Sequence, residues 1–286
     1  MSELLLLKKE DCKSCYKCIR ECALKSIRFS ENRAQIVERE CVYCGHCYVT
    51  CPQSAKEIRR DTDKARALIA SGRPVIVSLA PSFIADFGVG GLDGMRQALL
   101  KLGFADVEET ARGARIVKTE YERMIASGEH KLIISSCCHS VNLLIQKRYP
   151  QALPYLAKVD SPMLAHAKSI KERVPGSAVV FIGPCISKKD EAEQYGQVGC
   201  VLTFGGLIDW LAEEGIELPA GEQPDGTEAR SRFFPTAGGI IRSMDLDDGF
   251  SYIPIDGLRR CMDALEEIER GGMQNCFVEM NACEGS

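Results

Sequence analysis

The chain has 286 residues, a net charge of -4 at pH 7 and 15 cysteines. At roughly 150 residues per domain this length predicts two domains, and the interspersed charges leave no basic face for nucleic acid or acidic lipid. The apolar run from Leu4 to Leu7 is too short for a signal peptide, and no stretch reaches the roughly 18 apolar residues of a membrane span. Because disulfides rarely persist in a reducing compartment, the cysteines indicate metal ligation in a soluble, cytoplasmic protein.

Eight of the cysteines form two copies of one spacing near the amino terminus. This is the spacing of two-cluster bacterial ferredoxins, in which the last cysteine of each run binds the other cluster. Zinc sites and structural disulfides are the alternatives, but zinc motifs usually place two ligands, a long gap and two more. We therefore predict one 4Fe-4S cubane on Cys12, Cys15, Cys18 and Cys51, and a second on Cys41, Cys44, Cys47 and Cys22.

A domain boundary is predicted near Arg73, where Gly and Pro interrupt a charged, helix-like stretch over residues 56–70. We assign residues 1–60 to a small α+β ferredoxin domain and residues 73–286 to a second domain. In the second domain short apolar runs alternate with amphipathic stretches, which predicts an α/β fold with mostly parallel sheets. The expected strands are 75–80, 131–136, 178–183, 200–204 and 276–280, the expected helices are 93–102, 117–127, 162–174, 207–214 and 258–270, and a surface loop is expected at 218–226.

Cysteines also follow three of the strands predicted in the second domain. Cys137 and Cys138 follow one strand, Cys185 a second and Cys283 a third. Ligands in open α/β sheets bind beyond the carboxyl ends of the strands, so we expect these thiols at one rim, where they could share a metal cofactor. The cysteines within predicted elements are expected to pack as small hydrophobic side chains, and these are Cys200, Cys261 and Cys276.

Three segments around these cysteines resemble the signature segments of the iron-iron hydrogenases. They are Ser-Ser-Cys-Cys-His at 135–139, Gly-Pro-Cys-Ile-Ser-Lys-Lys at 183–189, and Glu-Met-Asn-Ala-Cys at 279–283. Further agreement comes from Leu-Ala-Pro-Ser at 79–82. Three spaced signatures in the right order are specific, whereas any one alone is weak. Together with the ferredoxin repeat, the resemblance covers nearly the whole chain.

The resemblance implies an H-cluster, a 4Fe-4S cubane joined through one cysteine to a two-iron unit with carbonyl, cyanide and dithiolate ligands. By position, Cys138, Cys185 and Cys283 would bind the cubane. Cys137 would exchange protons with the dithiolate amine, and Lys188 would donate to a cyanide, since a compact ammonium suits a small anion. Without the flanking motif, Lys188 looks like a solvated surface charge. The remaining residues expected to contact the cofactor are Ala80, Pro81, Ser82, Gly183, Pro184 and Asn281.

The chain departs from the family pattern at the third signature. The resemblance places a cysteine that bridges cubane and two-iron unit four positions after Cys283, one residue beyond Ser286. We therefore expect the natural chain to continue with a cysteine, and to carry a signalling region. Gly183 and Asn281 also stand where catalytic members have methionines, which changes the packing around the two-iron unit.

The proton relay of catalytic members, two glutamates and a serine, aligns with Tyr121, Met124 and Ala157. Methionine and alanine cannot exchange protons and tyrosine does so poorly near neutral pH, so we expect slow turnover. Glu120 or Glu122 could substitute, although glutamates on a helix surface are usually only solvated. His139, in place of the usual proline, is expected to be packed or solvated rather than a ligand.

The resemblance supports three functional hypotheses. The preferred one is a hydrogen-sensing module with slow, reversible H2 heterolysis and electron transfer through the two cubanes. The second is a catalytic hydrogenase that exchanges electrons with ferredoxin through clusters near about -400 mV. The third is an iron–sulfur scaffold similar to the hydrogenase-like proteins of Fe-S assembly, which would need neither Cys137 nor Lys188. The implied partners are H2, protons, a redox partner such as ferredoxin, and maturation proteins for the two-iron unit.

Overall fold

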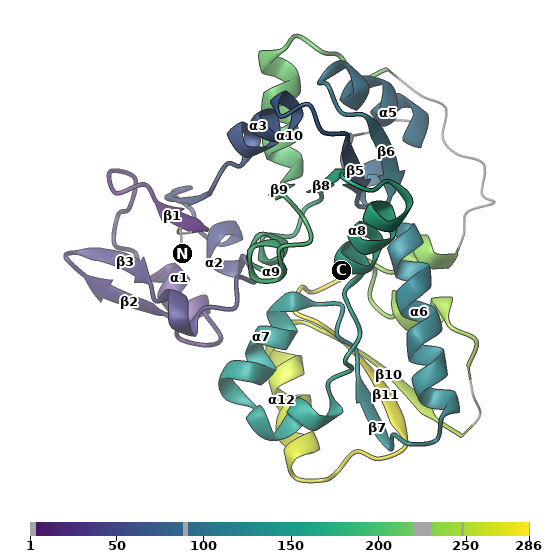
Figure 1. Cartoon of the computed structure of the whole chain (residues 1–286). Helices are drawn as coiled ribbons and strands as arrows, with labels where there is room; N and C mark the ends of the chain where they lie inside the picture. Colours follow the sequence, from purple (N-terminus) through teal and green to yellow (C-terminus); the bar gives the residue numbers. More distant parts are fainter. Residues whose placement is uncertain (1–3, 88–90, 220–229, 247–248, 286) are drawn as a thin grey trace.

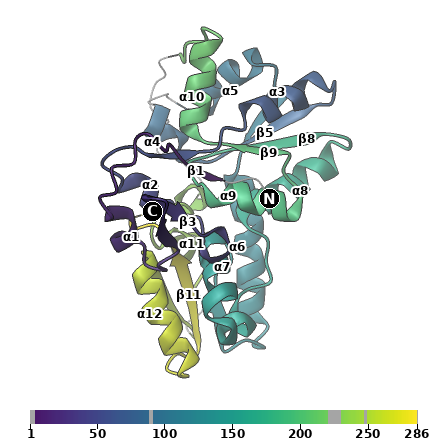
Figure 2. The same cartoon turned by 90° about the vertical axis from the view of Figure 1, so that its left-hand side faces the viewer.

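The structure is a computed structural model that describes residues 4–87, 91–219, 230–246 and 249–285. Figure 1 shows the amino-terminal residues as a small lobe, in purple, beside two larger α/β units that each contain a parallel sheet. Figure 2 shows the two units stacked one above the other, with the amino-terminal lobe against both. In the described ranges, no helix is long and apolar enough to cross a membrane.

The amino-terminal lobe has the α+β character predicted for it. Two antiparallel strand pairs, β1 with β4 and β2 with β3, hold its ends together, and the third cysteine of each run lies on a short helix. The helix-like character predicted for residues 56–70 is confirmed only in part, because a strand precedes the helix. The elements are β1 (Leu5–Leu7), α1 (Lys17–Glu21), β2 (Ile27–Ser30), β3 (Arg33–Ile36), η1 (Glu38–Glu40), α2 (His46–Val49), β4 (Lys56–Ile58) and α3 (Thr62–Ala70).

The first α/β unit contains a parallel four-stranded sheet with the order β6-β5-β8-β9. Its two central strands are apolar, largely β-branched and fully buried, as is typical of parallel strands with helices on both faces. Side chains from α3, α5, α8 and α10 join these strands in one core. The elements are β5 (Val75–Leu79), α4 (Phe83–Phe87), α5 (Leu92–Lys101), β6 (Asp106–Glu109), α8 (Pro162–Arg173), β8 (Ala178–Ile182), α9 (Ser187–Tyr195), β9 (Cys200–Leu202) and α10 (Phe204–Glu213).

The second α/β unit contains a parallel three-stranded sheet with the order β10-β11-β7. Successive side chains of a strand face opposite ways, so Ile133 and Phe277 pack toward α6, whereas Ile134 and Val278 pack toward α7 and α12. The elements are α6 (Ala111–Ala126), β7 (Leu132–Ile134), α7 (His139–Arg148), η2 (Pro150–Tyr155), η3 (Arg230–Phe233), α11 (Gly239–Ser243), β10 (Ser251–Asp256), α12 (Leu258–Glu269) and β11 (Cys276–Asn281).

Helices α6 and α8 pack closely where the two units meet. A Cβ at Gly113 would lie 2.1 Å from the carbonyl oxygen of Pro162, so only glycine permits this approach. The contact places the amino-terminal halves of both helices beside the carboxyl ends of the strands, where the predicted site lies.

The predicted α/β fold with parallel sheets is confirmed. All five expected strands and all five expected helices are present. Strands β6 and β10 and helices α7 and α9 were not expected, and α6 begins well before residue 117. Strand β6 is the sequence Asp-Val-Glu-Glu, which has poor strand propensity, but Glu108 and Glu109 form ion pairs with Arg173 and Arg232. Most of the loop expected at 218–226 lies outside the described residues.

A buried ion pair joins α3 to α9 next to the amino-terminal lobe. Lys189 donates from Nζ to Asp61 Oδ2 and to the carbonyl oxygen of Val201, both at 2.6 Å. The two side chains are only 1% and 2% exposed. Arg59 also donates to Asp61 at 3.0 Å, so two largely buried cations compensate the carboxylate, beside the more exposed Lys64.

Replacing Lys189 with methionine should destabilise the chain by about 3 kcal/mol, because removal of one partner leaves a buried carboxylate poorly compensated. Lys64, whose side chain is 50% exposed, contacts the same Asp61 at 3.2 Å. Its replacement by methionine should cost less than about 1 kcal/mol because solvent screens an exposed pair. Urea denaturation of both variants measures the difference, and equal costs would contradict the structural role of the buried pair.

Candidate iron–sulfur sites

The eight amino-terminal cysteines line two separate cavities, in the same two groups that their spacing predicts. Cys12, Cys15, Cys18 and Cys51 line the smaller cavity. The larger one, of about 340 Å³, is lined by Cys22, Cys41, Cys44 and Cys47. Each cavity thus takes three thiols from one run and one from the other, which is the exchange expected of a two-cluster ferredoxin.

The backbone of the two runs has the same unusual conformation at equivalent positions. Ser14 and Tyr43, each directly before the second cysteine of its run, have φ values of 53° and 54°. Tyr16 and Gly45, each directly after that cysteine, have φ values of 59° and 77°. A left-handed conformation is unfavourable for most residues other than glycine, so its repetition indicates loops that are shaped for a common purpose.

Backbone amide groups donate to the sulfur atoms of these cysteines, and burial raises the pKa of their thiols. The N–H of Tyr43 donates to Cys41 Sγ at 3.3 Å, and the N–H of Ala55 donates to Cys51 Sγ at 3.4 Å. Hydrogen bonds to sulfur tune the potential of a cluster. Burial raises the pKa of Cys41 to about 11 and that of Cys47 to about 12. Because iron binds thiolates, cluster binding at neutral pH must release these protons.

The thiol arrangement fits cubanes better than zinc. Throughout the described part of the chain, no three His, Cys, Asp or Glu side chains gather closely enough to hold a single metal ion. A structural zinc site needs four ligands within about 2.3 Å of one ion. In a cubane each thiolate binds a different iron atom, so its ligands surround a larger space, as the cysteines do here.

A further cavity, of about 280 Å³, lies where the strands of the two sheets end, and we call it the inter-sheet cavity. Cys137, Cys138, Cys185 and Cys283 line it together with Lys188. Burial, and then the proximity of Cys185, raises the pKa of Cys138. Three segments that are remote in sequence therefore bring their thiols to one cavity.

The expectation that these strands share one rim is wrong in one respect. Strand β8, which precedes Cys185, belongs to the four-stranded sheet, whereas β7 and β11 belong to the three-stranded sheet. The cavity is thus enclosed by the carboxyl ends of two sheets that face each other. Two opposed sheets enclose a cofactor more fully than one open rim, because protein then covers it from two sides.

Cys137 is partly buried and lies beside Tyr121. The Tyr121 hydroxyl lies 3.2 Å from Cys137 Sγ and 3.0 Å from Ser136 Oγ, and it accepts the Ser136 N–H at 2.8 Å. Burial raises the pKa of Cys137 to about 12, against the opposing effects of Tyr121 and Lys188. At neutral pH Cys137 is therefore a thiol, which can hold and deliver a proton.

Lys188 is not the solvated charge that its sequence surroundings suggest. Its side chain is 12% exposed, and Nζ donates to Glu191 Oε2 at 2.5 Å and to the carbonyl oxygen of Cys137 at 3.0 Å. Burial lowers the pKa of Lys188, but Glu191 outweighs burial and keeps it above its usual value. The ammonium has three donors, so with these two contacts one remains for an anionic ligand in the cavity.

The residues expected to contact the cofactor lie around the inter-sheet cavity, with one exception. Gly183 is not among the lining residues, since its role is to leave room for the Phe181 ring, which a Cβ would approach within 2.7 Å. Ser82 Oγ is buried with no hydrogen-bond partner among the described residues, so a polar ligand would satisfy it. The expected residues that do line the cavity are Ala80, Pro81, Ser82, Pro184 and Asn281.

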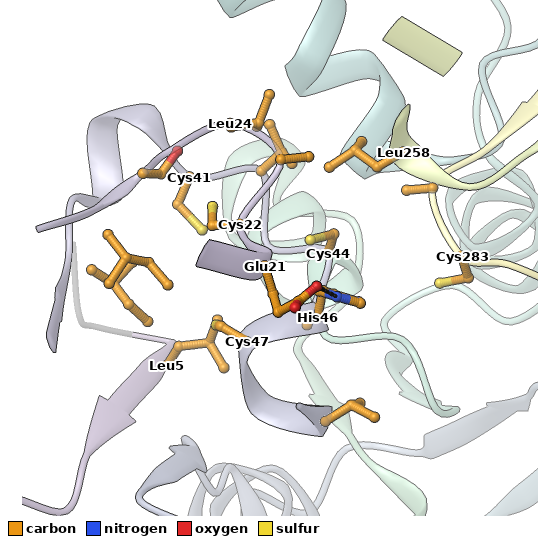
Figure 3. Close-up of a pocket in the computed structure, with 18 of the residues that line it drawn as sticks. Leu5, Glu21, Cys22, Leu24, Cys41, Cys44, His46, Cys47, Leu258 and Cys283 are labelled. Carbon is orange, nitrogen blue, oxygen red and sulfur yellow. Dashed lines mark ion pairs between the residues drawn. The ribbon is translucent and has the colours of Figure 1, made fainter. Parts of the chain in front are cut away.

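Cys283 lies between the inter-sheet cavity and the larger cavity of the amino-terminal lobe. It lines both, and Figure 3 shows Cys44 on the side of that lobe nearest to it. Partial burial, followed by the proximity of Cys185, Cys138 and Cys44, raises the pKa of Cys283 to about 12. The two cavities thus share Cys283 as a lining residue, which suits electron transfer between clusters bound in them.

Sequence reasoning missed several lining residues. Phe181 and Phe234 carry no chemical signal, and Thr110 lies at the end of the unexpected strand β6. His139 also lines the cavity, but it is 2% exposed and its Nε2 lies 2.7 Å from Asp190 Oδ2. It is therefore packed and paired, as expected, and is not directed to a metal. The three cysteines expected to be packed, Cys200, Cys261 and Cys276, are all buried.

The fold and the sites define an iron–sulfur protein in which a two-cluster ferredoxin lobe adjoins a thiol-lined cavity between two parallel sheets. Residues 73–286 match the family described as iron only hydrogenase large subunit, C-terminal domain. Residues 4–64 match the 4Fe-4S dicluster domain. The chain belongs to the iron-only hydrogenase large-subunit family and carries a dicluster ferredoxin domain at its amino terminus.

Curated proteins similar to this chain include cytosolic iron-sulfur assembly component 3 of Rattus norvegicus. Identity is 26% over 289 residues, covering 86% of this chain and 54% of the relative. The protein of the same name from Mus musculus is 26% identical over 226 residues, which is 65% of this chain and 48% of that protein. The chain thus spans about half the length of these two relatives.

Similar solved structures include a variant of FeFe-hydrogenase HydA1 from Chlamydomonas reinhardtii. The TM-score is 0.61 at 19% identity, covering 79% of this chain and 82% of that chain. A HydA structure described as revealing stepwise H-cluster assembly also has a TM-score of 0.61, with 20% identity and the same coverage. At these identities the likeness establishes the fold.

Proposed function

We propose that this chain is a hydrogen-responsive module that interconverts H2 with protons and electrons slowly. Electrons would pass through the two 4Fe-4S clusters of the amino-terminal lobe to a redox partner. The observation that carries the proposal is the contact of Cys137 with a buried tyrosine, in a cavity that otherwise retains the family's chemical groups.

The chain's own residues would hold the H-cluster, which supplies H2 heterolysis when bound. Cys138, Cys185 and Cys283 would each ligate one corner of its cubane. Lys188 would donate to an anionic ligand of the two-iron unit, because it remains a cation and keeps one donor for the cavity. Cys137 would hold a proton on Sγ and deliver it to, or receive it from, the reacting centre.

Slow turnover follows from what surrounds Cys137. Tyr121 is fully buried, and burial, with the neighbouring Cys137, raises its pKa well above the usual value. Its hydroxyl lies between Cys137 Sγ and Ser136 Oγ, and Ser136 Oγ donates to the carbonyl oxygen of Val159, which has no proton to pass on. Met124 and Ala157 belong to the same hydrophobic cluster as Cys137 and Tyr121, and neither side chain can exchange a proton. Slow exchange is acceptable in a sensor, because the signal depends on whether H2 has reacted at the site and not on the rate of turnover.

The two glutamates that could have replaced the relay are engaged elsewhere. Glu120 pairs with Arg123, and Glu122 pairs with Lys118 and accepts the Asp245 N–H. Both are therefore better described as surface charges on α6, which supports a slow module over a fast enzyme.

A non-catalytic iron–sulfur scaffold is the second candidate. The identity over 86% of this chain with a cytosolic iron-sulfur assembly component favours it. The retained Cys137 and Lys188, both directed toward the inter-sheet cavity, favour the hydrogen-responsive module, because a scaffold without the two-iron unit has no use for either.

Infrared spectroscopy and turnover of the matured full-length protein separate these functions. The proposal predicts carbonyl and cyanide bands, together with H2 oxidation at least about 100-fold slower than that of a catalytic FeFe-hydrogenase assayed beside it. A rate equal to the enzyme's would contradict the sensor. Bound cubanes without carbonyl and cyanide bands would instead identify the scaffold.

A further inference from the structure

A buried path of hydrogen bonds leads from the inter-sheet cavity toward the protein surface without passing through Tyr121. Thr110 lines the cavity, and its Oγ1 lies 2.8 Å from Ser78 Oγ. Ser78 Oγ lies 2.8 Å from His166 Nδ1, and His166 Nε2 lies 3.1 Å from Glu108 Oε2. The four residues come from the end of β6, from β5, from α8 and from β6 again.

The hydrogen-bonded path is buried along its length and ends beside two exposed arginine side chains. Ser78 and His166 are 0% exposed, and Thr110 is 6% exposed. The Glu108 side chain is 8% exposed, and it accepts hydrogen bonds from Arg112 at 2.9 Å and from Arg173 at 2.8 Å. These arginine side chains are 59% and 45% exposed, so the carboxylate lies at the edge of solvent.

We propose that Thr110, Ser78, His166 and Glu108 form a proton relay between the inter-sheet cavity and the surface. The proposal rests on the proposed function, which is what places an exchangeable proton in the cavity. It supplies a route for that proton where Tyr121, Met124 and Ala157 offer none.

Each link can pass a proton without a change in the heavy-atom arrangement. A proton from the cavity forms a bond to Thr110 Oγ1 while the original Thr110 proton moves to Ser78 and the Ser78 proton moves to His166 Nδ1. The Nε2–H bond of His166 then breaks as an O–H bond forms on Glu108, which releases its proton to water. No electron moves, and the net change is one proton transferred from cavity to solvent.

The relay is suited to single, reversible transfers. After one passage the imidazole carries its proton on Nδ1 instead of Nε2, so a second passage in the same direction first requires rotation of a fully buried ring. A transfer in the reverse direction restores the starting arrangement directly. This behaviour fits a module that registers hydrogen, because it needs few proton transfers.

The charges around His166 favour this role. The groups that face the imidazole are Ser78 on β5, Glu108 on β6, Arg112 on α6 and Arg173 on α8. Burial lowers the pKa of His166 against the opposing effect of Glu108, so the ring is neutral between transfers. Burial raises the pKa of Glu108, but Arg173, His166 and Arg112 outweigh it and hold that pKa below its usual value. Glu108 is therefore ionised and releases a received proton readily.

Two substitutions at Thr110 distinguish a role of its hydroxyl in proton transfer from a role of its side chain in packing. Thr110→Val removes the hydroxyl and keeps the shape, whereas Thr110→Ser keeps the hydroxyl and loses a methyl group. In the matured full-length protein, Thr110→Val should slow the exchange of H2 with D2O by about tenfold or more, and Thr110→Ser should restore most of the rate. Ser177→Ala removes a buried hydroxyl that has no partner among the described residues, and it should exchange at the wild-type rate.

A readout independent of activity comes from the histidines, of which the chain has 4. In protein labelled with 15N-histidine and carrying oxidised cubanes, Ser78→Ala should shift the imidazole resonances of His166 and leave those of His46, His130 and His139 in place. The same variant should slow H2 exchange about as much as Thr110→Val, while the carbonyl and cyanide bands stay unchanged.

Several outcomes would overturn the relay. They are wild-type exchange in Thr110→Val, equally slow exchange in Thr110→Ser, or an unmoved His166 signal in Ser78→Ala. In each case, intact infrared bands and measurable wild-type exchange would leave the proposed function standing. Absence of those bands and of exchange in the wild-type protein would instead remove the proposed function, and the relay with it.

Discussion

The Cys185→Ala variant should lose one of three cubanes while it retains the two in the amino-terminal lobe. Cys185 is the thiol that the four-stranded sheet contributes to the inter-sheet cavity, and the thiols of Cys138 and Cys283 lie close enough to it to affect each other's pKa. Without Cys185, ligands from only one of the two sheets remain. Iron in the matured protein should fall from about fourteen toward about eight atoms per chain, because the two-iron unit is lost with its cubane.

Cys276→Ala is the matched control for this loss. Cys276 is buried in β11, the strand that leads to Cys283, but it does not line the inter-sheet cavity. It should keep all of its iron and its infrared bands. Equal iron loss from both variants would mean that burial of a thiol, and not its place at the cavity, determines cluster retention.

The Cys137→Ala variant should retain its carbonyl and cyanide bands but exchange H2 with D2O at least about 100-fold more slowly than wild type, as is typical when a proton-transferring group is removed. Cys137 lines the cavity and is a thiol at neutral pH because burial raises its pKa to about 12. Alanine lacks the Sγ atom and therefore carries no transferable proton.

Tyr121→Phe provides the comparison for Cys137. It removes the hydroxyl that lies 3.2 Å from Cys137 Sγ and preserves the ring packed on Phe277. Because the hydrogen-bonded path from Tyr121 ends at Ser136 and the carbonyl oxygen of Val159, exchange should change by less than about threefold. A loss as large as that of Cys137→Ala would show that the tyrosine passes protons, and the explanation for slow turnover would then be wrong.

Much of the fold follows from local sequence. The central strands β5 and β8 consist mainly of β-branched residues, so their length and burial are readable from sequence alone. Strand β6 cannot be predicted in this way, because Glu108 and Glu109 are stabilised by arginines that are distant in the sequence. The division of the strands between two sheets was also inaccessible, since each sheet combines strands from remote parts of the chain.

The candidate site was predictable where ligands follow a spacing and unpredictable where chemistry depends on packing. The two groups of ferredoxin cysteines line separate cavities, as their spacing suggested. The burial of Lys188, the displacement of Gly183 from the cavity wall and the contact of Tyr121 with Cys137 arise from tertiary packing. The hydrogen-bonded path from Thr110 to Glu108 combines residues of three segments, so no short sequence motif predicts it.

The central claim is that Cys138, Cys185 and Cys283 bind one metal cluster between the two sheets, next to the second cluster of the amino-terminal lobe. Anomalous diffraction from crystals of the matured protein, recorded at the iron and zinc absorption edges, tests it most directly. The account predicts three separate iron clusters, one of them in contact with all three of these sulfurs. Iron confined to the amino-terminal lobe, or zinc at any of the three positions, would contradict it.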